Sequence, residues 1–187
     1  MMVRRFNSGF RNSLVATAIV LGMTGGAFAA LKPGDAAPDF TTTAALAGKT
    51  SSFDMKAALK KGPVVLYFFP KAFTQGCTLE AHAFAEASPE FNKMGATVYG
   101  ISRDDIDTLK KFSTEACRDQ FAVLSDADGK TVRAYDAGHA TRTGMANRIS
   151  YVIDKDGKVV FAHQGSDPVE HVQQTMDAVK KLSAVAR

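Results

Sequence analysis

The chain has 187 residues, of which 45% are hydrophobic and 22% charged, as in a soluble protein with one globular domain. Three arginines in the first 29 residues contribute most of the net charge of +4, and the rest of the chain holds 20 basic and 19 acidic residues. This balance argues against a strongly basic nucleic-acid-binding surface. Two cysteines are too few for a four-thiolate zinc site or a disulfide-dense scaffold.

The N-terminus has the pattern of a secretory signal peptide over residues 1–29. Three arginines precede an apolar run over residues 14–21, and Ala27-Phe28-Ala29 has the small-x-small form of a cleavage site. We therefore expect a domain over residues 30–187 that is periplasmic or secreted and has no stable membrane association after cleavage. Two alternatives are twin-arginine export and an uncleaved anchor, although the apolar run is shorter than the ~20 residues of a membrane span.

The next segments contain a predicted central strand. Residues 31–45 are rich in Pro, Gly, Asp and Thr and predict an extended entry segment. Val64–Phe69 is an apolar run of β-branched and aromatic residues, bounded by Gly62-Pro63 and by Pro70. Such a run is apolar on both faces, which is typical of a buried central strand.

Two helices are expected directly after this strand. The first spans residues 76–87. Ser88 followed by Pro89 predicts a fresh N-cap and first turn, so a second short helix should run from there to about Met94 and end at Gly95.

The remaining elements alternate between strands and helices. They are a strand over 97–102, a helix from Asp104 or Asp105 to about Ala116, a strand over 121–124 and a short helix over 130–135. A hairpin of strands over 148–153 and 158–162 follows. The last element is an amphipathic helix over 168–185, whose apolar face carries Val169, Val172, Met176, Val179 and Leu182. This alternation predicts an α/β fold with a mixed central sheet flanked by helices, the thioredoxin-like arrangement.

The chemically informative segment runs from Pro70 to Glu80. It leaves the predicted central strand and enters a helix, so Cys77 should lie in the first helical turn at the carboxyl end of a strand. Free backbone N–H groups and the helix dipole stabilise a thiolate there. Thr74, three residues earlier, is near enough to hydrogen-bond the sulfur or a bound oxygen. The alternative is that Cys77 is only a small buried apolar residue.

The order of these motifs resembles the peroxiredoxins, and within them the bacterioferritin comigratory protein or Q-type branch. The resemblance runs from about Leu31 to the C-terminus. It is carried by the opening segment 33–40, the Pro70-x-x-x-Thr74-x-x-Cys77 motif, Gly76-Cys77-Thr78, Gly100-Ile101-Ser102, Leu124-Ser125-Asp126 and the strand 148–154.

The resemblance implies a role for each residue of the site. Cys77 would be the peroxidatic cysteine, Thr74 would orient the peroxide, and Pro70 would shield the sulfur from water. Arg148 would hold the thiolate and polarise the peroxide, as a fixed cation beside sulfur does. The alternative for Arg148 is a surface charge at a strand end. Glu80 is expected to hydrogen-bond within the site, with a smaller part than Arg148.

The second thiol departs from the family pattern. Many relatives place a resolving cysteine five residues after the first, where this chain has His82. We expect His82 on the helix surface. The resemblance implies that Cys117, near the end of the following helix, resolves the oxidised Cys77. Two alternatives are a one-cysteine enzyme served by an external thiol and a structural Cys77–Cys117 disulfide.

The function implied by the resemblance is a thioredoxin-dependent peroxidase. It would reduce hydrogen peroxide or organic hydroperoxides, be restored by a thioredoxin-like or glutaredoxin-like partner, need no metal or organic cofactor, and act as a monomer. The alternatives are a thiol–disulfide oxidoreductase, which would usually carry Cys-x-x-Cys, and a non-catalytic thioredoxin-fold binding module with a structural disulfide.

Overall fold

The computed structural model describes Met1 and residues 30–185 of the chain. The predicted signal peptide therefore lies outside the described residues. The elements, in chain order, are β1 (Thr41–Leu46), β2 (Lys49–Asp54), α1 (Met55–Leu59), β3 (Val64–Phe68), α2 (Gln75–Lys93), β4 (Thr97–Ser102), α3 (Ile106–Glu115), β5 (Ala122–Ser125), α4 (Lys130–Ala134), β6 (Ile149–Ile153), β7 (Val159–Gln164) and α5 (Pro168–Val185).

The strands form one seven-stranded mixed sheet in the order β2-β1-β5-β4-β3-β6-β7. β3 lies inside it, parallel to β4 and antiparallel to β6, with Phe68 opposite both Ile101 and Ile149. All five side chains of β3 are buried, as its apolar run predicts for a strand covered on both faces. The thioredoxin-like α/β fold is thereby confirmed.

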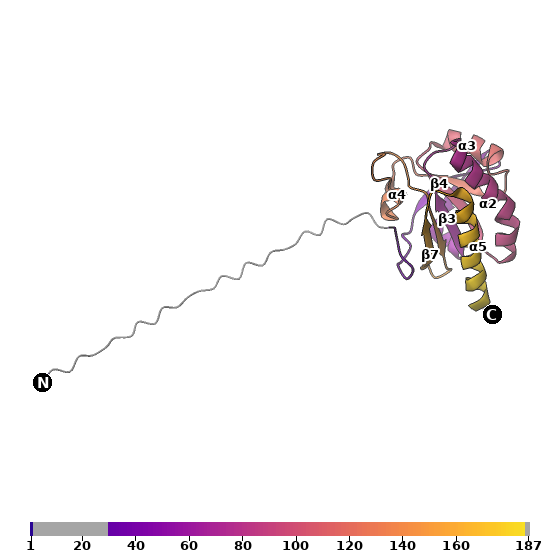
Figure 1. Cartoon of the computed structure of the whole chain (residues 1–187). Coiled ribbons are helices and arrows are strands. Elements are labelled where there is room, and N and C mark those ends of the chain that lie inside the picture. Colours follow the sequence, from indigo (N-terminus) through magenta and orange to yellow (C-terminus); the bar gives the residue numbers. More distant parts are fainter. Residues whose placement is uncertain (2–29, 186–187) are drawn as a thin grey trace.

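Helices cover both faces of the sheet. Val65 and Tyr67 of β3 share one apolar cluster with α2, α3 and α5, whereas Leu66 and Phe68 share another with α1 and α4. Figure 1 shows α2 and α5 lying over the same face of the sheet, with α4 on the other side of the domain. Because β3 contributes to both clusters, the loop that follows it is anchored from two sides. Among the described residues, no helix has the length and apolar character needed to cross a membrane.

The N-terminal part of the domain differs from the expected extended segment. Residues 41–54 form a hairpin, β1 and β2, in which Leu46 pairs with Lys49 across the two-residue turn Ala47-Gly48. Both turn residues have positive φ, 50° and 71°, as a tight hairpin turn requires. The strands are rich in Thr and Ser and β2 is mostly exposed, so they lack the apolar alternation that identifies a strand. The short helix α1 was also not predicted.

The predicted break at Ser88-Pro89 is wrong, because α2 is one helix of 19 residues with Pro89 inside it. Proline removes one intrahelical N–H donor. The helix nevertheless continues because Phe84 and Phe91, on either side of the break, are both fully buried. Burying one such side chain contributes about 2 kcal/mol. The Ser88 hydroxyl donates to the Phe84 carbonyl at 2.8 Å and does not act as a cap.

The other predicted elements are confirmed, and most of their predicted ends lie within one or two residues of the observed ends. Asp105 is the N-cap of α3, and its carboxylate accepts a hydrogen bond from the Thr108 N–H at 2.8 Å. The C-terminal hairpin and α5 also occur as expected. One position on the apolar face of α5 was wrong, since Val169 is 41% exposed.

Candidate active site

The loop between β3 and α2 is held by Asp104, which follows β4. The Asp104 carboxylate accepts hydrogen bonds from the Ala72 N–H and from the Ser102 hydroxyl, each at 2.8 Å. β3 and β4 are parallel neighbours, so their carboxyl ends meet at one edge of the sheet. Sequence reasoning treated Asp104 only as a candidate helix cap. In the structure it joins the loop before Cys77 to the next strand.

Phe73 gives this loop a strained conformation. Its φ is +62°, a region that a bulky residue rarely adopts. Its side chain is 46% exposed and packs edge-on against Phe112 of α3, with ring centroids 5.2 Å apart. The loop before Cys77 therefore packs against α3, the helix that precedes Cys117.

Cys77 lies in the first turn of α2 and its side chain is only 1% exposed. The Arg148 guanidinium lies against it, with Nη2 donating toward Sγ at 3.5 Å. A methyl group at Gly76 would come within 3.1 Å of that same Nη2, so the glycine leaves room for the arginine. The structure thus brings together Cys77 and Arg148, which are 71 positions apart in the chain.

Glu80, one turn after Cys77, contributes more to the site than expected. Its side chain is fully buried, and Arg148 Nη1 donates to its Oε2. Burial raises the pKa of Glu80 to about 8, although the Arg148 charge and hydrogen bond act in the opposite direction. One guanidinium therefore contacts both the thiol and a buried carboxyl group.

Thr74 and Pro70 lie in the segment between β3 and α2, and neither is fully buried. Thr74 is the N-cap residue of α2 and is exposed, and its hydroxyl donates to the Lys71 carbonyl at 2.9 Å. Pro70 and Arg148 line the same open pocket of about 580 Å³. A larger pocket of about 800 Å³ lies beside β1 and α4, and none of the five predicted site residues lines it.

Cys117 lies immediately after Ala116, the C-cap residue of α3, and is fully buried with a free thiol. Burial raises the pKa of the Cys117 thiol far above its ordinary value. Both cysteines belong to one apolar cluster, which also contains Tyr67. Burial raises the pKa of Tyr67 well above its usual range, and Cys117, Glu80 and Cys77 add to this shift.

Sequence reasoning missed a buried polar group behind Glu80, formed by Ser150 of β6 and His171 of α5. The Ser150 Oγ and His171 Nδ1 atoms are 2.8 Å apart and both side chains are fully buried. The available signal was the position of His171 directly before Val172 and four residues before Thr175, both on the inner face of α5. The described residues include no group of three or more His, Cys, Asp or Glu side chains arranged to hold a metal ion.

A thioredoxin-like fold in which a buried cysteine, Cys77, contacts an arginine, Arg148, is typical of thiol-dependent peroxidases. The family model for the AhpC/TSA family matches residues 33–162, and the chain belongs to this family. Within it, the chain is a peroxiredoxin of the Q-type or bacterioferritin comigratory branch. It is therefore an enzyme, an oxidoreductase of the group that reduces peroxides with thioredoxin-type reductants.

Three relatives illustrate the match. Peroxiredoxin Q, chloroplastic, of Populus jackii is 35% identical over 156 residues, which cover 83% of this chain and 71% of that protein. The crystal structure of peroxidoxin BcpB from Mycobacterium tuberculosis has a TM-score of 0.74 at 29% identity, over 81% of this chain and 98% of that one. The structure of peroxiredoxin Q from Xanthomonas campestris has a TM-score of 0.67 at 27% identity, over 75% of this chain and 90% of that one.

Proposed function

We propose that Cys77 is the peroxidatic cysteine of this peroxidase. Its thiolate attacks one oxygen of hydrogen peroxide or an organic hydroperoxide. An S–O bond forms, the O–O bond breaks, and the second oxygen leaves as water or an alcohol after taking up a proton. Cys77 becomes a sulfenic acid. The observation that carries this proposal is the Arg148 Nη2 atom 3.5 Å from the Cys77 sulfur.

Arg148, Thr74 and Pro70 have separate parts in this step. The Arg148 guanidinium stabilises the thiolate and the negative charge that develops on the leaving oxygen. The Thr74 hydroxyl donates its hydrogen to the Lys71 carbonyl, so its oxygen can accept a hydrogen bond from the O–H of a bound peroxide. Pro70, in the pocket wall beside Arg148, has no N–H and shields the sulfur from water.

Cys117 is the proposed resolving cysteine. Its thiol condenses with the sulfenic acid, an S–S bond forms, and water leaves. Two observations support this assignment: the shared apolar cluster, and the positive φ angles of Arg118 (50°) and Asp119 (60°) directly after Cys117. Such backbone conformations cost on the order of 1–3 kcal/mol each, which favours local opening at the end of α3. A thioredoxin-like or glutaredoxin-like dithiol then restores both thiols by exchange.

A coupled assay tests the proposed cycle. The protein, a thioredoxin, its reductase and NADPH are mixed with hydrogen peroxide, and NADPH consumption is followed. The proposal predicts turnover by the parent protein and none by Cys77→Ser. Turnover that survives Cys77→Ser would overturn the assignment of the peroxidatic cysteine. Reduction of a protein disulfide without any peroxide consumption would instead indicate a thiol–disulfide oxidoreductase.

We also propose that the domain is exported, cleaved after Ala29 and monomeric. The support for export is the order of charged, apolar and small residues over 1–29. N-terminal sequencing of the protein recovered from the extracytoplasmic fraction would begin at Ala30. Recovery of the full-length chain from the cytoplasm would contradict export, and light scattering of the cleaved form checks the monomer.

A further inference from the structure

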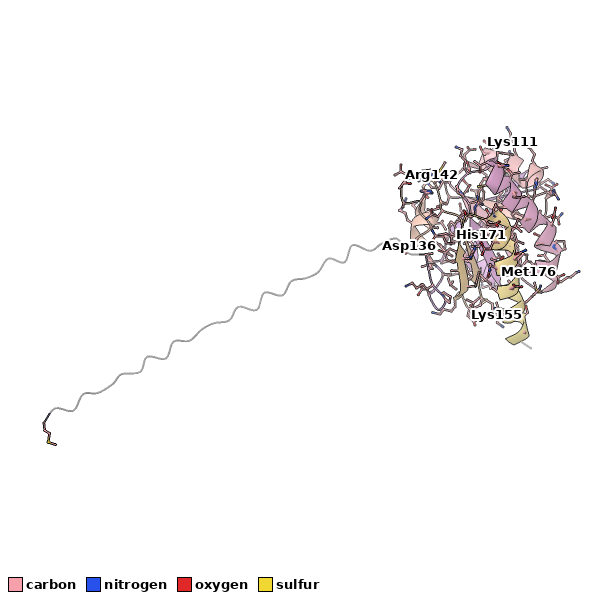
Figure 2. The ribbon with its side chains drawn as sticks, viewed as in Figure 1. Lys111, Asp136, Arg142, Lys155, His171 and Met176 are labelled. Atoms are coloured by element: carbon pink, nitrogen blue, oxygen red, sulfur yellow. The ribbon has the colours of Figure 1, made fainter. Side chains whose placement is uncertain are left out.

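A buried polar group lies next to Arg148 in the core of the domain. It consists of Glu80 on α2, Ser150 on β6 and His171 on α5, all with 0% exposure. Figure 2 shows His171 within the body of the domain, whereas Lys111 and Lys155 lie at its rim. Buried polar groups are costly unless they are paired, so this group requires a physical explanation.

The contacts of His171 identify which ring nitrogen carries its proton. Nε2 is 3.2 Å from the Gly165 carbonyl oxygen, which can only accept, so Nε2 carries the hydrogen. In the neutral ring Nδ1 is then a lone pair, and it accepts a hydrogen bond from the Ser150 hydroxyl at 2.8 Å. The fold thus selects the tautomer of His171 that has no N–H on the side of Glu80.

The two carboxyl oxygens of Glu80 have different surroundings. Oε2 accepts from Arg148, whereas Oε1 is buried without any hydrogen-bond partner among the described residues and lies 3.9 Å from His171 Nδ1. An ionised oxygen that faces a lone pair in a buried site is strongly disfavoured. Burial also raises the pKa of Glu80 to about 8 and lowers that of His171 to about 4. Both shifts favour a protonated Glu80 beside a neutral His171 at neutral pH.

The charged and titratable groups around this pair come from several elements. Arg148 and His163 of β7 disfavour a charged His171, and Asp167, just before α5, favours it. The His163 and His171 rings pack with centroids 4.5 Å apart, and Glu170 of α5 lies 3.8 Å from His163. Tyr67 interacts electrostatically with Glu80, and Cys77 precedes Glu80 by three residues on α2. Of these groups, only Arg148 is a fixed cation beside Glu80, and it also contacts the thiol.

We propose that His171 is a positioning residue of the Cys77 site: it presents a lone pair to Glu80, keeps that carboxyl group protonated, and so leaves the positive charge of Arg148 to the Cys77 thiolate. A neutral Glu80 holds Arg148 by a hydrogen bond alone, whereas an ionised Glu80 would compete with the thiolate for the same guanidinium. This inference rests on the proposed role of Arg148 beside Cys77.

Infrared spectroscopy measures the proton on Glu80 directly and requires no peroxidase activity. The parent protein at pH 7 should show the carbonyl stretch of a buried protonated carboxyl group, and this band should be absent from Glu80→Gln. Its disappearance on titration should have a midpoint near pH 8. An infrared difference between the parent and Glu80→Gln that lacks this band at pH 7 would overturn the proposal.

The variant His171→Asn tests the part played by the ring. Its amide places an N–H donor close to the position of Nδ1, so Glu80 should ionise at a pH lower by about one unit. The protonated fraction of Glu80 at pH 7 should then fall from about nine-tenths to about half, and iodoacetamide should alkylate Cys77 about twofold more slowly at pH 7. His163→Asn is the matched control, because His163 contacts His171 and not Glu80. It should behave like the parent.

A double variant separates positioning from a merely structural effect. In Glu80→Gln/His171→Asn the side chain at position 80 is always neutral, so alkylation should return to the Glu80→Gln rate. Unchanged spectra and alkylation in His171→Asn would contradict the proposal. If that variant does not fold, nitrogen NMR of the parent still tests the ring, since a proton on Nδ1 in place of Nε2 would also contradict it. The predicted infrared band without any peroxidase activity would instead refute only the proposed function.

Discussion

Arg148 and Cys77 contact each other through one end of the guanidinium group, with Nη2 3.5 Å from Sγ, while Nη1 at the other end donates to Glu80. The arginine precedes β6, the antiparallel neighbour of β3, whose end leads into the Cys77 loop. The side chain of Arg148 is only 12% exposed. A cation that is held in place by Glu80 and largely shielded from water interacts more strongly with the sulfur than a surface cation would.

Replacing Arg148 by Gln should slow the reaction of Cys77 with hydrogen peroxide by about 100- to 1000-fold, the usual effect of removing one donor that stabilises developing charge. Stopped-flow measurement of the second-order rate constant checks this. Arg142→Gln is the matched control, because Arg142 lines the same pocket but donates to His139. An equal loss in both variants would show that general positive charge, and not the contact with sulfur, matters.

Thr74 should act through its hydroxyl oxygen. Thr74→Ser retains an oxygen that can donate to the Lys71 carbonyl and should keep most of the peroxide reactivity. Thr74→Val is similar in shape without the oxygen, and should lose about 10- to 100-fold, because one hydrogen bond to the reacting peroxide is removed. The same stopped-flow assay measures both variants. Full activity of Thr74→Val would contradict the assigned role.

The disulfide step should be limited by opening of the segment after α3. Arg118 and Glu86 form an exposed ion pair at 3.0 Å that ties this segment to α2. Exposed pairs contribute up to about 1 kcal/mol, so Glu86→Gln should accelerate disulfide formation by at most about fivefold. Quenched-flow mass analysis after one equivalent of peroxide measures that rate. Glu90→Gln, whose partner Lys93 lies on the same helix, should leave the rate unchanged.

His171 should make the stability of the domain depend on pH in the acid range. Burial lowers its pKa from 6.5 to about 4, so the unfolded chain binds the proton more readily. Its contribution to stability is therefore present above pH 6.5 and is lost as the pH falls to 4, by about 3 kcal/mol. Urea unfolding of the parent and of His171→Gln at pH 4 and pH 7 measures this. A difference between the two proteins that is the same at both pH values would contradict the buried neutral ring.

The parts of the fold that the sequence predicted well have strong local signals. Val64–Phe68 is apolar on both faces, and Asp105 is followed three residues later by the N–H group that it caps. The hairpin over residues 41–54 was missed because polar β-branched residues lack an apolar period. The break at Pro89 was predicted from local propensity, which burial of Phe91 overrides.

The candidate site also contains some features that the local sequence predicts and others that it does not. Cys77 is placed by its own neighbours, at the junction of a buried strand and a helix, so its position follows from local pattern. Its contact with Arg148 joins two segments far apart in the chain, and the family resemblance was needed to expect it. The position of His171 beside Val172 and four residues before Thr175 indicates only that it is buried. Its contacts with Glu80 and Ser150 depend on the packing of α2 and α5 against the sheet.

The most direct test of the two-cysteine mechanism is the intact mass of the reduced protein after one equivalent of hydrogen peroxide. The parent should lose two hydrogens, and Cys117→Ser should gain one oxygen on Cys77. Cys77→Ser should remain unchanged over the same time. A parent protein that gains oxygen without forming a disulfide would contradict the role of Cys117, and a parent that does not react would contradict the role of Cys77.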